Sequence, residues 1–137
     1  MAILVDTGVW VAAADTDEPR HQACAELLHR HRGDLVVPAP VVAETAWLIE
    51  ARLGPTAEAR FLRLVTTRQV RVVDLTVADY ERCVALIDTY ADLGLGLVDA
   101  SVVTVAENLA VTTVATLNHR DFRVVRPRHV DAFTLVP

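Results

Sequence analysis

The chain has 137 residues, with 13 basic side chains, 18 acidic side chains and a formal net charge of −5. This length suffices for one domain with a buried core and is too short for two. All the basic residues are arginine, which excludes lysine-dependent chemistry such as a Schiff base, a Walker A phosphate loop or the lysine of a phosphorylation receiver. Hydrophobic residues make up 53% and aromatic residues 5%, so we expect an aliphatic core and apolar surface for a partner, such as a second copy.

The sequence carries no signal for a membrane, for export or for zinc. No apolar run approaches the roughly 20 residues of a membrane span, and the N-terminus lacks a basic region and a small-residue cleavage site. Cys24 and Cys83 are isolated and lack metal-ligand spacing, so we expect both to pack in the core. These features predict a cytoplasmic protein that does not contact a membrane.

The first ten residues predict a buried strand followed by a helix. Ala2–Val5 is a continuous apolar run, which is typical of a central strand in a parallel sheet. Asp6 ends the run, and Thr7 and Gly8 turn the chain into a helix that begins near Val9. Asp6 is therefore either a helix cap or a functional carboxylate at the carboxyl edge of the sheet, where open α/β sheets bind ligands.

Helical and extended patterns alternate along the rest of the chain. Proline and glycine residues mark several boundaries, and Thr76 with Asp79 predicts a capping pair. We expect helices over 9–14, 19–32, 41–53, 55–67, 76–90 and 98–110, and strands over 35–37, 70–75, 112–117, 124–125 and 133–136. This order predicts an α/β fold, a three-layer α/β/α sandwich on a mainly parallel central sheet, as a single domain over residues 1–137.

Two acidic residues occur within apolar helical patterns. Glu44 lies three and four residues before Trp47 and Leu48, so we expect it on their apolar face, where a carboxylate is costly unless paired or bound to a cation. Asp99 lies in the first turn of the mostly apolar helix 98–110. It either complements the helix dipole or, as a carboxylate on a buried stripe, serves a function.

The segment after the strand 112–117 is polar and basic. Asp121 is the one acid between His119 and His129, and the same segment holds four arginines at positions 120, 123, 126 and 128. The segment is either a solvated edge of the molecule or a surface that binds phosphates beside an acidic site.

Convergence of the acids would require a cation. Like charges a few ångströms apart cannot all remain ionised without a counter-charge. A ligand set of carboxylates suits Mg²⁺ or Mn²⁺ and not zinc, and such ions commonly activate water and neutralise phosphoryl oxygens. The candidate acids are Asp6, Glu44, Asp99 and Asp121.

Four short motifs together resemble the PIN-domain ribonucleases, and specifically the VapC-type toxins of bacterial toxin–antitoxin pairs. The motifs are DTG at 6–8, the glutamate of VVAETAWLI at 44, LVDAS at 97–101, and ATLNHRDF at 115–122 followed by VRP at 125–127. They span nearly the whole chain in the order and spacing of that family.

The resemblance implies a PIN-like fold and a metal-dependent endoribonuclease that leaves a 3′-hydroxyl and a 5′-phosphate. It also implies a cognate antitoxin, a homodimer and an RNA substrate. Its implied catalytic residues are Asp6, Glu44, Asp99 and Asp121; its metal ligands are Asp6, Asp99 and Asp121; and its supporting residues are Thr7, Thr116 and Asn118. Many family members carry an acid at position 118, so either Asp121 or Asn118 supplies the fourth ligand.

In this interpretation Asp6 and Asp99 hold the Mg²⁺ or Mn²⁺ ion directly, and Glu44 and Asp121 orient the attacking water or a second ion. Arg120 and Arg126 contact the RNA backbone. One alternative is a catalytically silent PIN-like module that binds RNA or protein. Another is a phosphotransfer protein, either a receiver or a haloacid-dehalogenase-like phosphatase. The absence of lysine counts against both, and Gly8 counts against the phosphatase, whose motif has a second aspartate there.

Overall fold

The computed structural model describes residues 1–137 and contains one five-stranded sheet in the order β3-β2-β1-β4-β5. All four strand pairs are parallel, so the expected sheet is confirmed and has no antiparallel strand. The central strand β1 (Ile3–Val5) aligns Leu4 with Val36 of β2 (Leu35–Pro38) and with Val114 of β4 (Thr113–Ala115). Leu4, Val36 and Val114 are almost fully buried, as expected of a strand covered on both faces.

The outer strands are β3 (Arg71–Val73) and β5 (Thr134–Val136). The helices, in chain order, are α1 (Thr7–Ala14), α2 (His21–Arg30), α3 (Ala39–Leu53), α4 (Pro55–Thr66), α5 (Val77–Thr89), α6 (Leu97–Leu109) and α7 (His119–Val124), with a 3₁₀ turn, η1 (Ala91–Leu93), before α6.

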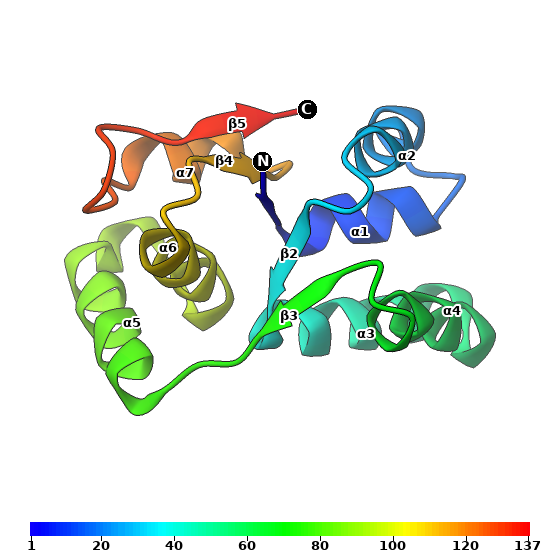
Figure 1. The fold of residues 1–137 in the computed structure, drawn as a ribbon, viewed down its shortest axis with the longest axis horizontal. Helices are drawn as coiled ribbons and strands as arrows, with labels where there is room; N and C mark the ends of the chain where they lie inside the picture. The colour runs from blue at the N-terminus through cyan, green and yellow to red at the C-terminus, as the bar shows by residue number, and fades with distance from the viewer.

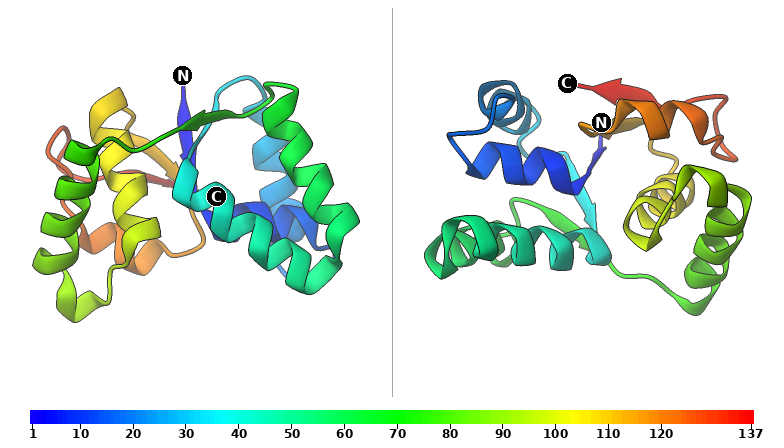
Figure 2. Two further views of the ribbon diagram at one scale, coloured as in Figure 1. Left: turned by 90° about the horizontal axis from the view of Figure 1, so that it is seen from below. Right: turned by 180° about the vertical axis from the view of Figure 1, so that it is seen from behind.

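The helices cover the two faces of the sheet unequally. Helices α1 to α4 lie on one face and α5 to α7 on the other (Figures 1 and 2). This division follows from the right-handed connection between parallel strands. The chain passes from β1 to β2 and β3 in one direction, and then returns to β4 and β5 in the opposite direction, so its later helices fall on the opposite face.

The reversal of direction creates a switch point between β1 and β4. Open α/β sheets bind ligands at the carboxyl ends of the strands on either side of such a point. The residues that follow these two strands are Asp6 and Thr116. Helices α3 and α6, although they belong to opposite faces, also contact each other, and this contact brings residues of both helices to the same end of the sheet.

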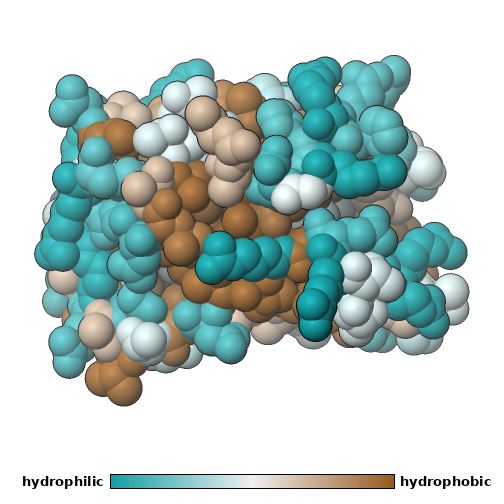
Figure 3. All heavy atoms as spheres, in the orientation of Figure 1, coloured by the Kyte–Doolittle hydropathy of each residue, from teal (hydrophilic) through white to brown (hydrophobic).

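The core is aliphatic and continuous, as the composition predicts, and contains 30 buried hydrophobic residues. The edge-to-face pair of Trp10 and Phe61, with ring centroids 5.5 Å apart, joins α1 to α4. Cys24 and Cys83 are both buried and free, which confirms their expected packing. Some apolar surface stays uncovered: Figure 3 shows a hydrophobic area over β2, β3 and α6, ringed by hydrophilic side chains.

Two local predictions are wrong. The predicted strand at Val124 and Val125 is absent, because α7 extends through Val124. Asn118 caps this helix by accepting from the Asp121 N–H group. The helix predicted over 19–32 is shorter, since the His21 N–H group donates to Glu18 in a turn before α2, and the chain turns again near Gly33, whose φ is 93°.

Candidate active site

Asp6 is a buried carboxylate at the end of the central strand, with 7% of its surface exposed. Its Oδ1 accepts from the Thr7 N–H group at 2.8 Å, and its Oδ2 accepts from the Thr116 hydroxyl at 2.9 Å. Burial raises the pKa of Asp6, the two hydrogen bonds oppose that rise, and the charge of Glu44 adds to it. Asp6 therefore caps α1 and also presents a carboxylate at the switch point, so the two sequence interpretations are compatible.

Glu44 reaches the same site from α3, although the sequence argument for it is partly wrong. The buried stripe of α3 consists of Val41, Thr45 and Ile49, whereas Trp47 is 67% exposed. Glu44 therefore does not share a buried face with Trp47. It lies beside that stripe, on the side where Leu48 also lines the cavity.

Asp99 enters the site from the first turn of α6, on the other face of the sheet. Its pKa is raised to about 6, mainly because burial disfavours the charged form, and further because of the charges of Asp6, Asp121 and Glu44. Helix α6 packs against β1, β2 and α3, and this packing brings Asp99 close to Asp6. The order of strands and helices in the sequence does not predict that approach.

Asn118 and Asp121, the two candidates for the fourth ligand, lie differently with respect to the cavity. Asn118 lines the cavity and Asp121 does not. The Asn118 side-chain amide donates to Asp121 Oδ2 at 2.8 Å, and Asp121 also lies 4.0 Å from Arg120 Nε. Asp121 thus affects the cavity through its charge on Asp99 and by holding Asn118 in place.

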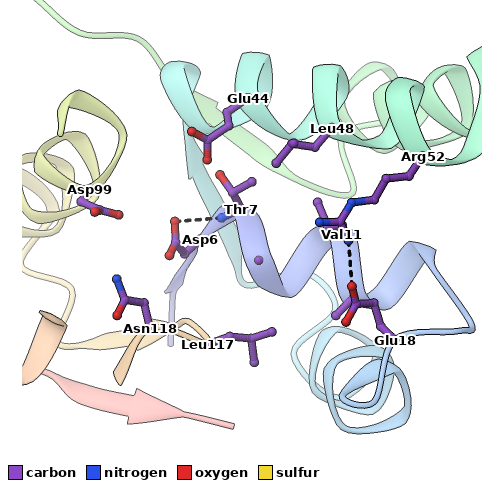
Figure 4. Close-up of a pocket in the computed structure, with 12 residues that line it drawn as sticks. Asp6, Thr7, Val11, Glu18, Glu44, Leu48, Arg52, Asp99, Leu117 and Asn118 are labelled. Atoms are coloured by element: carbon purple, nitrogen blue, oxygen red, sulfur yellow. Dashed lines mark hydrogen bonds and ion pairs between the residues drawn. The ribbon is translucent and has the colours of Figure 1, made fainter. Parts of the chain in front are cut away.

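These side chains face one cavity of about 490 Å³ at the carboxyl end of the sheet. Figure 4 shows Asp6, Glu44 and Asp99 around one end of the cavity, Asp6 from the end of β1 and the other two from α3 and α6. Arg52 is the one basic residue in the lining, and its Nη1 lies 2.7 Å from Glu18 Oε1. The lining residues are Asp6, Thr7, Gly8, Val11, Ala12, Glu18, Glu44, Leu48, Arg52, Asp99, Leu117 and Asn118.

Neither Glu18 nor Arg52 is predicted by the motifs. For Arg52 the sequence does contain a signal: Glu44, Leu48 and Arg52 are spaced at i, i+4 and i+8, which places them on one side of a helix. Glu18 comes from the turn between α1 and α2, where no periodic pattern could indicate its direction.

The chemistry of the cavity fits a hard divalent cation. Its potential ligands are oxygen atoms, as Mg²⁺ and Mn²⁺ prefer, and the buried Thr7 hydroxyl has no hydrogen-bond partner. The pKa values of Asp6 and Asp99 are raised. A cation bound nearby would lower both pKa values, because it favours the charged carboxylates. No three His, Cys, Asp or Glu side chains converge closely enough to hold an ion by themselves. One or two carboxylates with several waters are the usual ligand set of Mg²⁺ in proteins.

The two arginines predicted to contact RNA differ in whether their side chains are free to bind a ligand. The Arg120 side chain is 89% exposed. The Arg126 guanidinium folds back and donates to the carbonyl oxygens of Arg123 and Val125, at the end of α7. Arg120 is available to a ligand, while Arg126 stabilises the end of a helix.

The fold and the cavity define an α/β sandwich protein with an acidic site at the switch point of a parallel sheet. Residues 3–126 match the family model of the PIN domain, and the chain therefore belongs to the PIN domain family.

Known proteins of this kind are similar along most of the chain. Ribonuclease VapC26 of Mycobacterium tuberculosis is 31% identical over 135 residues, which cover 98% of this chain and 100% of that protein. The crystal structure of VapC20 of M. tuberculosis, described as a toxin that cleaves the sarcin-ricin loop, matches with a TM-score of 0.77 and 22% identity, over 82% of this chain and 87% of that one. VapBC2 of Rickettsia felis, solved with a fragment of promoter DNA, matches with a TM-score of 0.68 and 15% identity over the full length of both chains.

No helix of the structure is both long enough and apolar enough to cross a membrane.

Proposed function

We propose that this protein is a metal-dependent endoribonuclease and the toxin of a type II toxin–antitoxin pair. The observation that carries the proposal is the approach of Asp6, Glu44 and Asp99 to one cavity from three different elements. The name of the relative that is 31% identical, a ribonuclease, supports the same activity. RNA carries the phosphates on which hard cations act.

In this proposal Asp6 and Asp99 would hold Mg²⁺ or Mn²⁺ directly. Asp121, which does not line the cavity, would act on the ion through Asn118, to which it is hydrogen-bonded. When bound, the ion would neutralise phosphoryl charge and lower the pKa of an attacking water. Glu44 would orient the attacking water in line with the P–O3′ bond, so that cleavage of this bond would leave a 3′-hydroxyl and a 5′-phosphate.

The polar neighbours support these acids. The Thr7 N–H group and the Thr116 hydroxyl fix the direction of the Asp6 carboxylate. The exposed Arg120 contacts an RNA phosphate near the site. Arg126, whose guanidinium is held at the end of α7, contributes less to RNA binding than Arg120 does.

The second candidate is a silent PIN-like module that binds RNA or protein without cleaving it. One observation favours it: the acids, as placed, do not converge on a metal position. The raised pKa values of Asp6 and Asp99 weigh against it, because a binding module gains nothing from costly buried carboxylates.

Cleavage of mixed structured RNAs by purified protein distinguishes the two candidates. The wild type is compared with Asp99→Asn in Mg²⁺, in Mn²⁺ and in chelator. Asp88→Asn is the matched control, because Asp88 is exposed on α5 and does not line the cavity. We expect discrete fragments from the wild type and from Asp88→Asn only with metal, and a loss of at least a hundredfold in Asp99→Asn.

Near-normal cleavage by Asp99→Asn would show that Asp99 is not a catalytic residue. If the wild type released no fragments and calorimetry showed no binding of Mg²⁺ or Mn²⁺, the silent module would replace the nuclease.

We further propose that an antitoxin binds the groove between α1, α2, α3 and α4. This groove has a volume of about 270 Å³ and is almost entirely apolar. The indole Nε1 of Trp10, which lines it, is buried without a hydrogen-bond partner. An amphipathic helix could cover such a groove with its apolar face. The lining residues are Trp10, Ala13, Ala14, Leu28, Ile49, Ala57, Arg60, Phe61 and Leu64.

A homodimer is also part of the proposal. Val77, Tyr80 and Val84 are 77%, 48% and 58% exposed and recur at i, i+3 and i+7 along α5, which gives one apolar stripe facing away from the core. Light scattering after size-exclusion chromatography tests for a dimer. Because the proposed substrate is cellular RNA, the proposal places the protein in the cytoplasm.

A further inference from the structure

The lining of the acidic cavity contains four carboxylates and one cation. Asp6, Glu18, Glu44 and Asp99 are the acids, and Arg52 is the cation. A polynucleotide brought to this cavity is repelled by the acids, and a metal ion compensates only the part nearest to itself. The lining thus has one side chain of its own that could attract a phosphate at a distance from the metal.

Helix α3 places Arg52 at a defined distance from the acidic centre. Glu44 and Arg52 lie eight residues apart on one side of the helix, which corresponds to about 12 Å along its axis. Figure 4 shows Glu44 toward the end of the cavity that holds Asp6 and Asp99, and Arg52 at the opposite end beside Glu18. The Arg52 guanidinium, held by Glu18 at the end of the cavity away from Asp6 and Asp99, is thus placed for a phosphate beside the scissile one.

The partner of Arg52 in this structure is easily exchanged. Arg52 makes one hydrogen bond of 2.7 Å to Glu18 Oε1, and the two side chains are 46% and 32% exposed. Exposed pairs of this kind contribute little to stability. A phosphate offers the guanidinium two parallel hydrogen bonds, which the single contact with Glu18 does not provide.

From these observations we infer that Arg52 is the phosphate-binding residue of the cavity, and that Glu18 holds its guanidinium at the cavity mouth until RNA replaces the pair. The inference rests on the proposed nuclease function and extends it: the substrate is bound through a phosphate beside the one that is cleaved. Glu18 is a positioning residue, and it also opposes RNA through its charge.

A purely structural role for the pair makes a different prediction. Arg52 lies in the last turn of α3, where a cation complements the helix dipole, and the pair also links α3 to the turn before α2. If that were its whole role, removing either partner would have the same effect. If Arg52 binds phosphate, removing Arg52 weakens RNA binding, whereas removing Glu18 leaves it unchanged or strengthens it.

The test is binding of a fluorescein-labelled single-stranded RNA of mixed sequence, measured by anisotropy in Mg²⁺ over a range of salt concentrations. The parent is the Asp99→Asn variant, so that the probe stays intact. To it are added Arg52→Ala, Glu18→Gln, or the matched control Arg63→Ala, whose side chain is exposed on α4. Thermal unfolding of each variant checks that the fold is retained.

We expect Arg52→Ala to weaken binding about tenfold or more, since a hydrogen-bonded charge pair is lost, and to reduce the salt slope by about 0.7 for a single strand. Glu18→Gln should bind as tightly as the parent or more tightly, and Arg63→Ala within about twofold.

The inference is overturned if Arg52→Ala binds within twofold of the parent, or if Arg52→Ala and Glu18→Gln weaken binding equally. Those results leave the nuclease proposal intact, because they concern only the binding of an RNA phosphate by Arg52, at a distance from the acidic residues. Failure of the parent itself to bind RNA would overturn the inference, whereas the nuclease proposal is decided separately by RNA cleavage and metal binding of the wild type.

Discussion

At the scale of single residues, Asp99 shows how strongly the environment decides what a carboxylate does. Asp88 and Asp99 are both aspartates on helices; Asp88 is exposed on α5, while burial and three neighbouring acids raise the pKa of Asp99 to about 6. Perturbed groups of this kind are typical of functional sites. The same perturbation makes Asp99 costly for the free protein, which leads to a prediction about stability.

In the absence of metal, Asp99→Asn should stabilise the protein at neutral pH and not in acid. The pKa of Asp99 rises from 3.8 in the unfolded chain to about 6 in the fold, so the folded state favours the protonated form. The stability associated with this group is therefore fully present below the unfolded pKa and is lost as the pH rises through about 6. We expect a gain of about 1 kcal/mol in Asp99→Asn near neutral pH, less than the full shift implies, because solvent screens a partly exposed group.

Urea unfolding in chelator at a series of pH values measures this effect, with Asp88→Asn as the control. The difference between wild type and Asp99→Asn should shrink toward zero as the pH falls below the ordinary pKa of an aspartate. A difference that does not change with pH would contradict the raised pKa.

At the scale of elements, α3 and α6 carry the site. Helix α3 contributes Glu44, Leu48 and Arg52 to one side of the cavity, and α6 contributes Asp99. On its other side α3 packs against α1 and α4, where the apolar groove lies. The proposed nuclease site and the proposed antitoxin groove therefore share a helix, although Ile49 belongs to the groove and Glu44 to the cavity.

A large side chain in the groove should block the antitoxin without impairing cleavage. Ala57 lines the groove from α4, and Ala57→Trp would fill part of the space that the partner helix needs. The matched control is Ala85→Trp, at an exposed position of α5 on the opposite face of the sheet. We expect Ala57→Trp to need at least tenfold more cognate antitoxin for inhibition of RNA cleavage, and Ala85→Trp to behave as wild type. Equal inhibition of both variants would place the antitoxin elsewhere.

At the scale of the whole molecule, the reversal of the sheet brings distant parts of the chain together. The Thr116 hydroxyl donates to Asp6 across 110 residues of sequence, because β4 and β1 are neighbours at the switch point. Acids brought together in this way repel one another. A cation that binds only the folded state would relieve this repulsion and stabilise the fold.

Mn²⁺ or Mg²⁺ should therefore raise the melting temperature of the wild type. At a metal concentration about 100 times the dissociation constant, the gain is about 2.7 kcal/mol, which corresponds to a rise of several degrees in a domain of this size. The double variant Asp6→Asn, Asp99→Asn should show no rise. The double variant Asp88→Asn, Asp92→Asn, which changes two exposed acids, should respond as the wild type does. Equal shifts in all three proteins would indicate non-specific binding of the ion.

The sequence by itself determined the fold class and much of the candidate site. Apolar runs ended by polar residues defined the sheet strands 35–37, 112–117 and 133–136 to within a few residues, because burial on both faces requires such runs. Asp6 could be assigned to the edge of the sheet from its position after the first strand. Short-range signals failed where two local patterns compete, as at Val124, whose β-branched side chain suggested a strand while Asn118 caps a helix there.

Only the tertiary structure decided which acids meet. The approach of Asp99 to Asp6 depends on how α6 packs across the end of the sheet, and the access of Asn118 to the cavity in place of Asp121 depends on the turn that begins α7. The pairing of Arg52 with Glu18 joins residues 34 positions apart. Periodicity reports which side of an element is buried, whereas these contacts depend on the direction and spacing of separate elements, which long-range packing sets.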